Sequence, residues 1–434
     1  MIHVAVVGAG AAGTMAALHL LRRRDSRALR LTVIDPDART GPGVPYRTTD
    51  PRHLLNVPAG RLSADASEPL DFVAWLGGNG LPGAGPEDFV PRGLFGRYLS
   101  SAFDGARGDR VTRVHRRAVA VATHGRGLAV TLCNGGRVRA DAVILAAGPN
   151  TPGTSWAPKW LRDSALFVSD PWRSGALDGL PEDGDLLLVG TGLTMADLTC
   201  TLRRPDRVVH AISRSGLLPR AHRLDPSSPV PAPAFTIDSG QVLERSVRYV
   251  QDMIAQGGDA CVAVDALRPH AGALWAAMTD DERSHFLRKY RRLWDIHRHR
   301  MAPRTAAQVD RYLGDGGLRL HCAELVNTVA AGTGVRVMLS TGQVLDVCAV
   351  INCTGPQYDI TAAADPLWGQ LLADGLVKPG PLNLGLDTDA EGRLLPGVVP
   401  MWTLGPLRRG NLWETTAFAE IRAQAERLAA LIGS

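Results

Sequence analysis

The chain has 434 residues, of which 45% are hydrophobic, so it is long enough for two or three domains with sizeable cores. Its net charge of +5 comes from arginines spread along the chain, and because only 5% of the residues are aromatic, no nucleic-acid surface is expected. The sequence has no apolar run long enough to span a membrane, no N-terminal leader pattern and no C-x-x-C pair among its 6 cysteines, so it predicts a cytoplasmic protein without a membrane span, disulfide scaffold or metal site.

The first predicted element is a strand that ends in a glycine turn, IHVAVVGAGAAG at residues 2–13. Gly8 permits the tight turn, Gly10 lets a pyrophosphate approach the backbone, and Gly13 lets the following helix pack on the strand. The next strand ends in Asp35, 22 positions after Gly13, where an acidic residue can bind an adenosine ribose. We expect the adenosine diphosphate of FAD to bind here; the alternative is a strand-helix-strand unit without a ligand.

Residues 36–70 form a Pro- and Gly-rich stretch that is too long for a simple connection, so a functional loop is expected. Within it, HLLNVPA offers the amide of Asn56 and the apolar Val57 as a wall for a flavin ring. Ordinary loop capping is the alternative for His53 and Asn56. Alternating strands follow from residue 111 and end in the buried run VILAAG, whose last residue is Gly148.

A second glycine turn, LLLVGTGLTMAD, occupies residues 186–197. Gly190 and Gly192 keep the first two glycine positions, although Met195 replaces the third. The following strand ends in Ser213 and Arg214 rather than in an acid, and an arginine suits the 2′-phosphate of NADPH, which a carboxylate would repel. The alternative is that Arg214 is an ordinary surface arginine.

The pattern is helical from about residue 240 to residue 314, and one segment is rich in arginine. Helical spacing places Arg288, Arg291, Arg292 and His299 on one face, together with Asp295. Three uses are open for this face: a solvated surface, a bidentate clamp for a substrate carboxylate, or recognition of the cofactor phosphate. We expect the substrate clamp.

Strands return after the helices and end in NCTG, which resembles the earlier VILAAG and predicts that the chain comes back to its first domain. Gly148 and Gly355 either pass close to the bound dinucleotide or simply end their strands. Further on, Gly405 precedes a loop, after which Glu414, Thr415 and Thr416 are expected to begin a helix. The N-terminus of this helix either faces the pyrimidine end of the flavin or serves helix initiation alone.

These blocks together resemble a known group of proteins. The order of GAGAAG, GPGVPYRTTDPRHLLNVPAGRLS, GTGLTMAD, SRSGLLPRAH and GPLRRGNLWETTAFAEIRAQAERLA is similar to the bacterial FAD/NAD(P)-binding oxidoreductases called YdhS-like, over nearly the whole chain. The resemblance implies non-covalent FAD, a discontinuous FAD domain and an inserted NAD(P)H domain. It also implies a relationship to flavin-dependent N-monooxygenases, including the aspartate N-monooxygenases that form nitrosuccinate.

The predicted fold class is therefore α/β, with a Rossmann-like FAD domain, an inserted NADPH domain and a helical subdomain. We expect the FAD domain at residues 1–178 and 346–434, the NADPH domain at 179–240 and 315–345, and a helical substrate or cap region at 241–314.

The residues also limit the reaction. A disulfide reductase needs a redox cysteine pair, which the sequence lacks. A monooxygenase needs no catalytic side chain, because a flavin C4a-hydroperoxide carries the chemistry. We expect an NADPH-dependent monooxygenase that uses O2 to N-hydroxylate a small amino acid or carboxylated amine, with aspartate as first candidate. An NADPH:acceptor reductase or oxidase, a flavin redox sensor without turnover, and assembly as a homodimer stay open.

Overall fold

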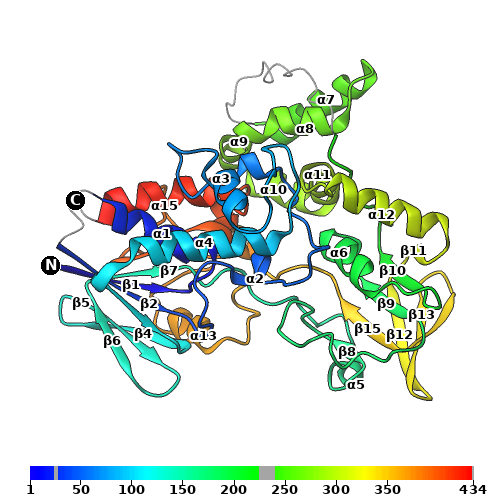
Figure 1. Cartoon of the computed structure of the whole chain (residues 1–434), viewed down its shortest axis with the longest axis horizontal. Coiled ribbons are helices and arrows are strands. Elements are labelled where there is room, and N and C mark those ends of the chain that lie inside the picture. Colours follow the sequence, from blue (N-terminus) through cyan, green and yellow to red (C-terminus); the bar gives the residue numbers. More distant parts are fainter. Residues whose placement is uncertain (24–27, 224–239, 433–434) are drawn as a thin grey trace.

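The computed structural model of the chain describes residues 1–23, 28–223 and 240–432, and two parallel β-sheets organise it (Figure 1). The first sheet has the order β16-β7-β1-β2-β3. Its strands are β1 (Ile2–Val7), β2 (Leu29–Ile34), β3 (Val111–Val114), β7 (Ala142–Leu145) and β16 (Met401–Thr403). Helices α1 (Ala11–Arg22), α4 (Arg92–Ala106) and α15 (Phe418–Ile432) share a core with Val4 and Val6 of β1, whereas Ala5 and Val7 face a second core. This burial on both faces explains the continuous apolar run of β1.

The second parallel sheet has the order β11-β10-β9-β15-β8. Its strands are β8 (Phe167–Val168), β9 (Leu186–Val189), β10 (Val209–Ser213), β11 (Leu318–Cys322) and β15 (Ala349–Asn352). Helices α6 (Leu193–Leu202) and α12 (Pro303–Gly314) cover one face, where Met195, Leu198 and Val309 are buried. Met195, which stands at the third glycine position of the sequence motif, is therefore a core residue of this domain.

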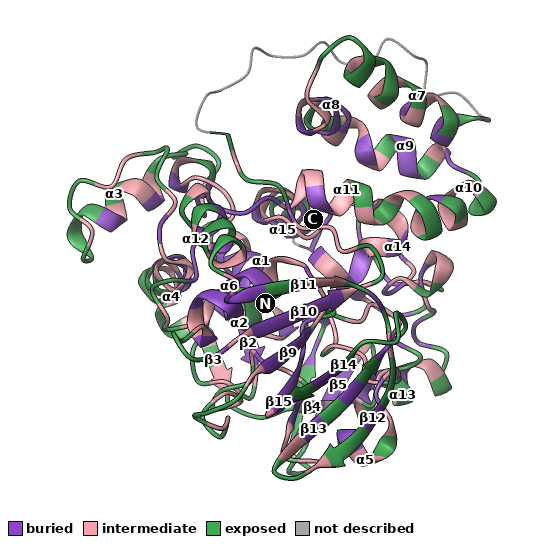
Figure 2. Ribbon diagram, turned by 90° about the vertical axis from the view of Figure 1, so that its right-hand side faces the viewer, coloured by how far each residue is buried: buried purple, intermediate pink, exposed green. Residues whose placement is uncertain are grey.

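The two domains repeat one plan. Read from opposite ends, the orders β7-β1-β2-β3 and β15-β9-β10-β11 match strand for strand. The edge strands next to β7 and β15 differ, because β16 is the last strand of its sheet in the chain and β8 is the first of its sheet. Each domain also has a three-stranded antiparallel sheet directly before its returning strand. These sheets are β4 (Ala118–His124), β5 (Gly127–Leu132) and β6 (Arg137–Ala140), and β12 (Leu325–Ala331), β13 (Gly334–Leu339) and β14 (Val344–Val347). Along β13, buried and exposed residues alternate, as expected for a sheet with one solvated face (Figure 2).

This repeat corrects the expected domain boundaries. β7 and β15 occupy equivalent places, so VILAAG and NCTG resemble each other because each ends the returning strand of its own sheet. β8 and β15 both pair within the second sheet, although the expected boundaries at 178 and 346 assign them to the FAD domain. The second domain therefore begins before Phe167 and ends after Asn352, with the helices of residues 242–298 inserted into it, and α12 belongs to it as well.

A helical subdomain lies at the top of Figure 1. It contains α7 (Val242–Ala255), α8 (Ala260–Leu267), α9 (Ala271–Ala277), α10 (Asp280–His285) and α11 (Arg291–Arg298). Thr279 and Glu282 form a reciprocal capping box at the start of α10. The core of the subdomain is aromatic and includes Trp275, Phe286 and Trp413. Trp413 comes from the C-terminal part of the chain. A π-helical turn at Phe286–Tyr290 joins α10 to α11.

The remaining helices are short. They are α2 (Gly43–Tyr46), α3 (Asp71–Gly78), α5 (Lys159–Arg162), α13 (Pro366–Ala373) and α14 (Arg409–Leu412). Within residues 1–23, 28–223 and 240–432, no helix has the length and apolar character needed to cross a membrane.

Candidate functional site

The first glycine turn has the geometry of a dinucleotide cradle. Gly8 has a φ of +103°, and a Cβ on it would lie 2.3 Å from the carbonyl oxygen of Ala146. A Cβ on Gly13 would lie 1.8 Å from the carbonyl oxygen of Gly8. These positions therefore require glycine, and Gly10 stands directly before α1, where backbone amides point toward a phosphate.

A second glycine segment, at residues 41–43, lies against this turn, and this contact was not predicted from the sequence. Gly43 has a φ of +51°, and a Cβ on it would lie 2.9 Å from the Cα of Gly10. The amide of Gly41 donates to the carbonyl oxygen of Ala9 over 2.8 Å. The G-P-G triplet at the start of the GVPY block was the available signal, because three such residues together mark a tight turn.

Asp35 lies at the carboxyl end of β2, beside the turn. Its carboxylate accepts hydrogen bonds from the amide of Ala9 over 2.6 Å and from the amide of Asp37 over 2.8 Å. Burial raises the pKa of Asp35, and the two amides act in the opposite direction. The carboxylate is thereby oriented next to the glycine turn, in the position expected for a ribose acceptor.

The second glycine turn repeats this geometry in the other domain. Gly190 has a φ of +114°, and a Cβ on it would lie 2.4 Å from the carbonyl oxygen of Cys353. A Cβ on Gly8 would meet the carbonyl oxygen of Ala146 in the same way. Gly192 precedes α6, and no described atom outside its immediate neighbours lies within 4 Å of the position that a Cβ on it would take. The first glycine of each turn is thus held by the strand that returns beside it, whereas the second glycine faces Gly43 in the first turn and open space in the second.

The end of β10 carries the residues expected to select NADPH. The Ser213 hydroxyl lies 2.8 Å from the Thr191 hydroxyl and accepts from the amide of Gly216 over 3.1 Å, so Ser213 shapes the turn. The Arg214 side chain is 84% exposed, and its Nε lies 3.8 Å from Oε1 of Glu324. Arg214 is therefore accessible to an anionic ligand.

Gly148 and Gly355 follow β7 and β15, at equivalent places in the two domains. Both have positive φ angles, +73° and +83°, and each Cβ position is at least 4 Å from every described atom outside its immediate neighbours. Glycine is thus favoured at these crossings by backbone conformation rather than by crowding.

The arginine face does not form the expected convergent clamp. Arg288 and Arg291 are exposed, and Nε of Arg291 lies 3.8 Å from Asp295. His299 is half-buried, 3.9 Å from the same carboxylate. The π-helical turn at 286–290 explains the difference, because it changes the angular spacing that the sequence argument assumed between Arg288 and the later residues.

Arg292 points elsewhere, into the second glycine turn. Its Nη2 donates to the carbonyl oxygen of Thr191 over 3.1 Å, to the Thr191 hydroxyl over 3.0 Å, and to the carbonyl oxygen of Leu217. Burial lowers the pKa of this guanidinium. Arg292 therefore braces the second glycine turn and does not converge with Arg288 and Arg291.

The C-terminal residues assigned to FAD also differ from expectation. α15 begins at Phe418, so Glu414, Thr415 and Thr416 precede the helix and do not begin it. Thr415 donates to the carbonyl oxygen of Gly405 over 3.0 Å and accepts from Gln424 over 2.8 Å. Thr415 is thus used to hold the Gly405 loop against α15.

Glu414 faces the helical subdomain. Its carboxylate accepts from Nε1 of Trp294 over 2.9 Å and from Nε of Arg298 over 3.0 Å. Although burial opposes ionisation, Arg298 and His299 hold the pKa of Glu414 below its ordinary value.

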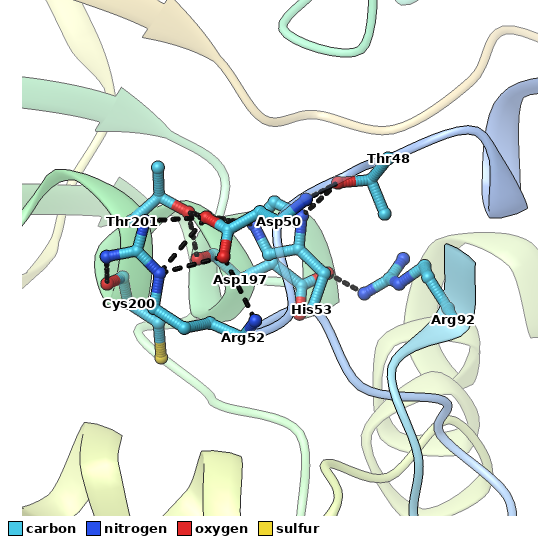
Figure 3. Close-up of polar contacts among 8 residues, drawn as sticks. All are labelled: Thr48, Asp50, Arg52, His53, Arg92, Asp197, Cys200 and Thr201. Carbon is cyan, nitrogen blue, oxygen red and sulfur yellow. Dashed lines mark hydrogen bonds and ion pairs between the residues drawn. The ribbon is translucent and has the colours of Figure 1, made fainter. Parts of the chain in front are cut away.

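A polar network joins the two domains and was not foreseen from the sequence (Figure 3). Asp50 and His53 lie on the loop of the first domain, and Thr201 lies on α6 of the second. The Thr201 hydroxyl donates to Oδ2 of Asp50 over 2.7 Å, and Nε2 of His53 lies 2.8 Å from the same hydroxyl. His53 therefore contacts the second domain, a role beyond the loop capping that the sequence analysis considered.

An ion pair accompanies this network. Nη2 of Arg92, the first residue of α4, donates to Oδ2 of Asp197 on α6. Burial raises the pKa of Asp197 to about 6, against the opposing effect of Arg92. A carboxylate inside the apolar run LTMADLTC was the available sequence signal, because a buried charge needs a partner.

The loop continues to Asn56 and Val57. The carbonyl oxygen of Asn56 lies 2.8 Å from Nε2 of His222. The HLLNVPA and SRSGLLPRAH blocks, which carry much of the resemblance, therefore touch. Val57 is half-buried against the first core.

The helical subdomain contains an apolar cavity of about 290 Å³. Its walls include Trp275, Phe286, Trp294 and Trp413. It is separate from the two glycine turns, whose residues do not line it.

Comparisons with known proteins agree with this geometry. Residues 5–150 match the family described as FAD-NAD(P)-binding. No curated protein matches the sequence. Similar solved structures include an ornithine N-hydroxylase from Kutzneria sp. 744, with reduced FAD, NADP+ and L-ornithine (17% identity, TM-score 0.68, covering 100% of this chain and 99% of the other). Another is an L-lysine 6-monooxygenase from Pseudomonas syringae (15% identity, TM-score 0.67, covering 100% and 99%).

A bacillithiol disulfide reductase from Staphylococcus aureus is similar as well (10% identity, TM-score 0.59, covering 99% of this chain and 98% of the other). At such identities the likeness concerns the fold. It confirms the expected α/β architecture with two dinucleotide-binding domains and the expected relationship in fold to N-hydroxylating enzymes. The chain thus has the fold of these two-domain enzymes, and its residues 5–150 are similar to the FAD-NAD(P)-binding family.

Proposed function

We propose that this chain is an FAD-dependent, NADPH-using monooxygenase that hydroxylates the nitrogen of a small amine-bearing substrate. The observation that carries the proposal is the pair of equivalent glycine turns, at Gly8 and Gly190, in two domains that share the order of four strands. Two such turns provide one dinucleotide site for FAD and one for the nicotinamide cofactor that reduces it.

FAD fits the first turn. Gly10 keeps side chains away from a pyrophosphate, Gly13 lets α1 pack against the turn, and Asp35 presents a carboxylate where a ribose hydroxyl can donate. Asn56, Val57, Gly148 and the Gly405 loop are proposed to lie along the rest of the cofactor. When bound, FAD supplies the two-electron chemistry and the activation of O2 that the protein side chains cannot supply.

NADPH fits the second turn. The amides that begin α6 after Gly192 are proposed to bind the pyrophosphate, and Arg214 the 2′-phosphate. Arg292 braces the turn at Thr191 and adds positive charge beside it. Gly355 lies at the crossing after β15, which corresponds to Gly148 in the first domain.

The substrate class is inferred from chemistry and from the neighbours. The names of the first two neighbours specify ornithine and lysine, both of which carry a primary amine. Aspartate stays the first candidate, because the sequence blocks resemble aspartate N-monooxygenases. The exposed Arg288 and Arg291 are retained as candidate ligands for its carboxylates.

An NADPH:acceptor reductase or oxidase is the competing function, since the fold also occurs in a reductase, although the chain lacks the cysteine pair of a disulfide reductase. The test is O2 uptake by the purified holoenzyme with NADPH and, separately, L-aspartate, L-ornithine, L-lysine or cadaverine. A monooxygenase shows uptake stimulated by one amine, an N-hydroxylated product in proportion to NADPH consumed, and little free H2O2. Uptake that no amine changes, with H2O2 as the only product, would overturn the proposal in favour of an oxidase or reductase.

A further inference from the structure

The contact between the two domains centres on α6, the helix that follows the second glycine turn. Asp197 and Thr201 are four residues apart, so they lie on one face of this helix. That face meets the loop of residues 48–53 and the start of α4, both from the first domain (Figure 3). One rigid helix therefore carries a nucleotide turn at its N-terminus and a domain contact along its side.

The contact is buried and charged. The side chains of Asp197 and Arg92 are 5% and 18% exposed, and Arg92 also lies 5.5 Å from the ring centre of Trp172. Loss of either partner leaves the other charge without compensation in a dry site, so a shift of α6 across this surface is strongly opposed. The ring centre of Trp172 also lies 5.3 Å from that of His53, in an edge-on arrangement.

The hydrogen-bond directions in the network are determined. The Thr201 hydroxyl donates to Asp50, so it can only accept from His53, whose Nε2 must carry the proton. Nδ1 of His53 then accepts from the Thr48 hydroxyl over 2.8 Å. Burial lowers the pKa of His53 to about 4, and Arg92 acts in the same direction, so the neutral ring that this pattern requires is the stable form at neutral pH.

The loop reaches the flavin wall a few residues later. The carbonyl oxygen of His53 accepts from the amide of Arg92 over 2.9 Å, and three residues further on Asn56 contacts His222. Arg52 adds a bond from Nη1 to the carbonyl oxygen of Cys200 over 3.1 Å. The loop segment is thus bonded to α6 on one side and to α4 on the other.

We infer that Asp197 and Thr201 are positioning residues, which fix the nucleotide turn at residues 190–192 relative to the loop that ends in Asn56 and Val57. This inference rests on the proposed function, in which electrons pass from NADPH to FAD between these two places. Displacement by about 1 Å can slow such a transfer by about two orders of magnitude without preventing cofactor binding.

The test uses two variants of the FAD-loaded protein, Thr201→Val and Asp197→Asn. Thr201→Val keeps the volume of the side chain and removes the two hydrogen bonds that the Thr201 hydroxyl makes to Asp50 and His53. Asp197→Asn removes the negative charge that pairs with Arg92. Arg336→Gln is the matched control, because it breaks an ion pair with Asp346 that is exposed, in the same domain and remote from α6. Anaerobic reduction of FAD is followed with saturating NADPH and, separately, with dithionite, which needs no NADPH domain.

Both variants are expected to lose about tenfold or more in the rate of reduction by NADPH, with less than about threefold change in the NADPH dissociation constant. FAD content and reduction by dithionite should equal those of the wild type and of Arg336→Gln. Wild-type rates in Thr201→Val and Asp197→Asn, or a loss confined to NADPH affinity, would overturn the inference.

Hydrogen exchange gives a readout that is independent of turnover, with NADP+ as the probe. NADP+ should slow exchange at residues 186–197 in all proteins, and at residues 48–56 only in the wild type and Arg336→Gln. Equal protection of residues 48–56 in Thr201→Val, or none in the wild type, would overturn the inference. If NADPH fails to reduce FAD in the wild type, the proposed function fails, and the exchange experiment still decides whether α6 is coupled to the loop.

Discussion

Oε2 of Glu414 lies 3.0 Å from Nε of Arg298, and both side chains are only 8% exposed. Arg298 ends α11 of the helical subdomain, and Glu414 lies just before α15 of the first domain. The pair therefore connects two parts of the molecule that are more than 100 residues apart in the chain.

Loss of one member of this pair should destabilise the folded protein. Because the other charge stays buried without a partner, Glu414→Gln or Arg298→Met should lower the free energy of unfolding by about 3–5 kcal/mol, measured by urea denaturation. The double variant Glu414→Leu/Arg298→Met should recover much of that loss. Unchanged stability with loss of FAD in Glu414→Gln would instead support the flavin contact expected from the sequence.

Gly192→Leu should separate the two nucleotide sites. Its Cβ would meet no described atom outside its immediate neighbours within 4 Å, so the variant should fold and retain FAD. The larger side chain should occupy the space proposed for the NADPH pyrophosphate and abolish measurable NADPH binding in a calorimetric titration. Gly10→Leu is the counterpart and should lose FAD, since its Cβ would lie 3.2 Å from Gly43 in the first turn. Full FAD occupancy in Gly10→Leu would contradict the FAD assignment.

Arg214→Ala should change the preference between the two nicotinamide cofactors. A charge-assisted contact to the 2′-phosphate contributes about 1.5–3 kcal/mol, so the KM for NADPH should rise by roughly 10- to 150-fold. The KM for NADH should stay close to that of the wild type, because NADH lacks this phosphate. An equal rise for both cofactors would mean that Arg214 has a structural role.

Arg292 and Arg291 are adjacent but differ in what they contact, so they form a matched pair. Arg292→Ala removes the three contacts to Thr191 and Leu217 and should weaken NADPH binding by about tenfold or more. Arg291→Ala should leave NADPH binding unchanged, and any effect should be on the KM for the amine substrate. A loss of substrate binding in Arg292→Ala with normal NADPH binding would restore the carboxylate clamp at that residue.

His53 should make stability depend on pH. The unfolded side chain has its ordinary pKa of 6.5, and the folded one about 4, so the unfolded state binds more protons between these values. The free energy of unfolding should therefore fall as pH decreases from about 6.5 toward 4, by up to roughly 3 kcal/mol.

Asp197 acts with the opposite sign, because its pKa of about 6 lies above the ordinary 3.8 and the folded state takes up that proton first. The comparison of wild type with His53→Gln isolates the histidine, with urea denaturation at about pH 5 and about pH 7.5. The variant should lose less stability on acidification. An identical pH dependence in both proteins would show that His53 does not carry the effect.

The turns themselves could be predicted from the sequence, because their requirements are local. Gly8 and Gly190 need positive φ angles and the absence of a Cβ, and no other residue type meets both conditions. The apolar strands that lead into the turns could also be predicted, because their pattern of buried residues is likewise local. The similarity of VILAAG and NCTG likewise reflected a real repeat, although the domain boundary drawn from it was wrong, since strand pairing and not chain position decides which sheet a strand joins.

Side-chain partners were decided only in the tertiary structure. A π-helical turn of five residues changes the angle around the helix axis between Arg288 and the arginines that follow it. A spacing rule that assumes a regular α-helix does not include this change. Arg92 and Asp197 are 105 positions apart, and each is surrounded in sequence by residues that do not identify the other. A backbone conformation depends on a few consecutive residues, whereas the partner of a buried charge depends on how distant segments dock, so the sequence determined the nucleotide turns and the folded chain determined what holds them in register.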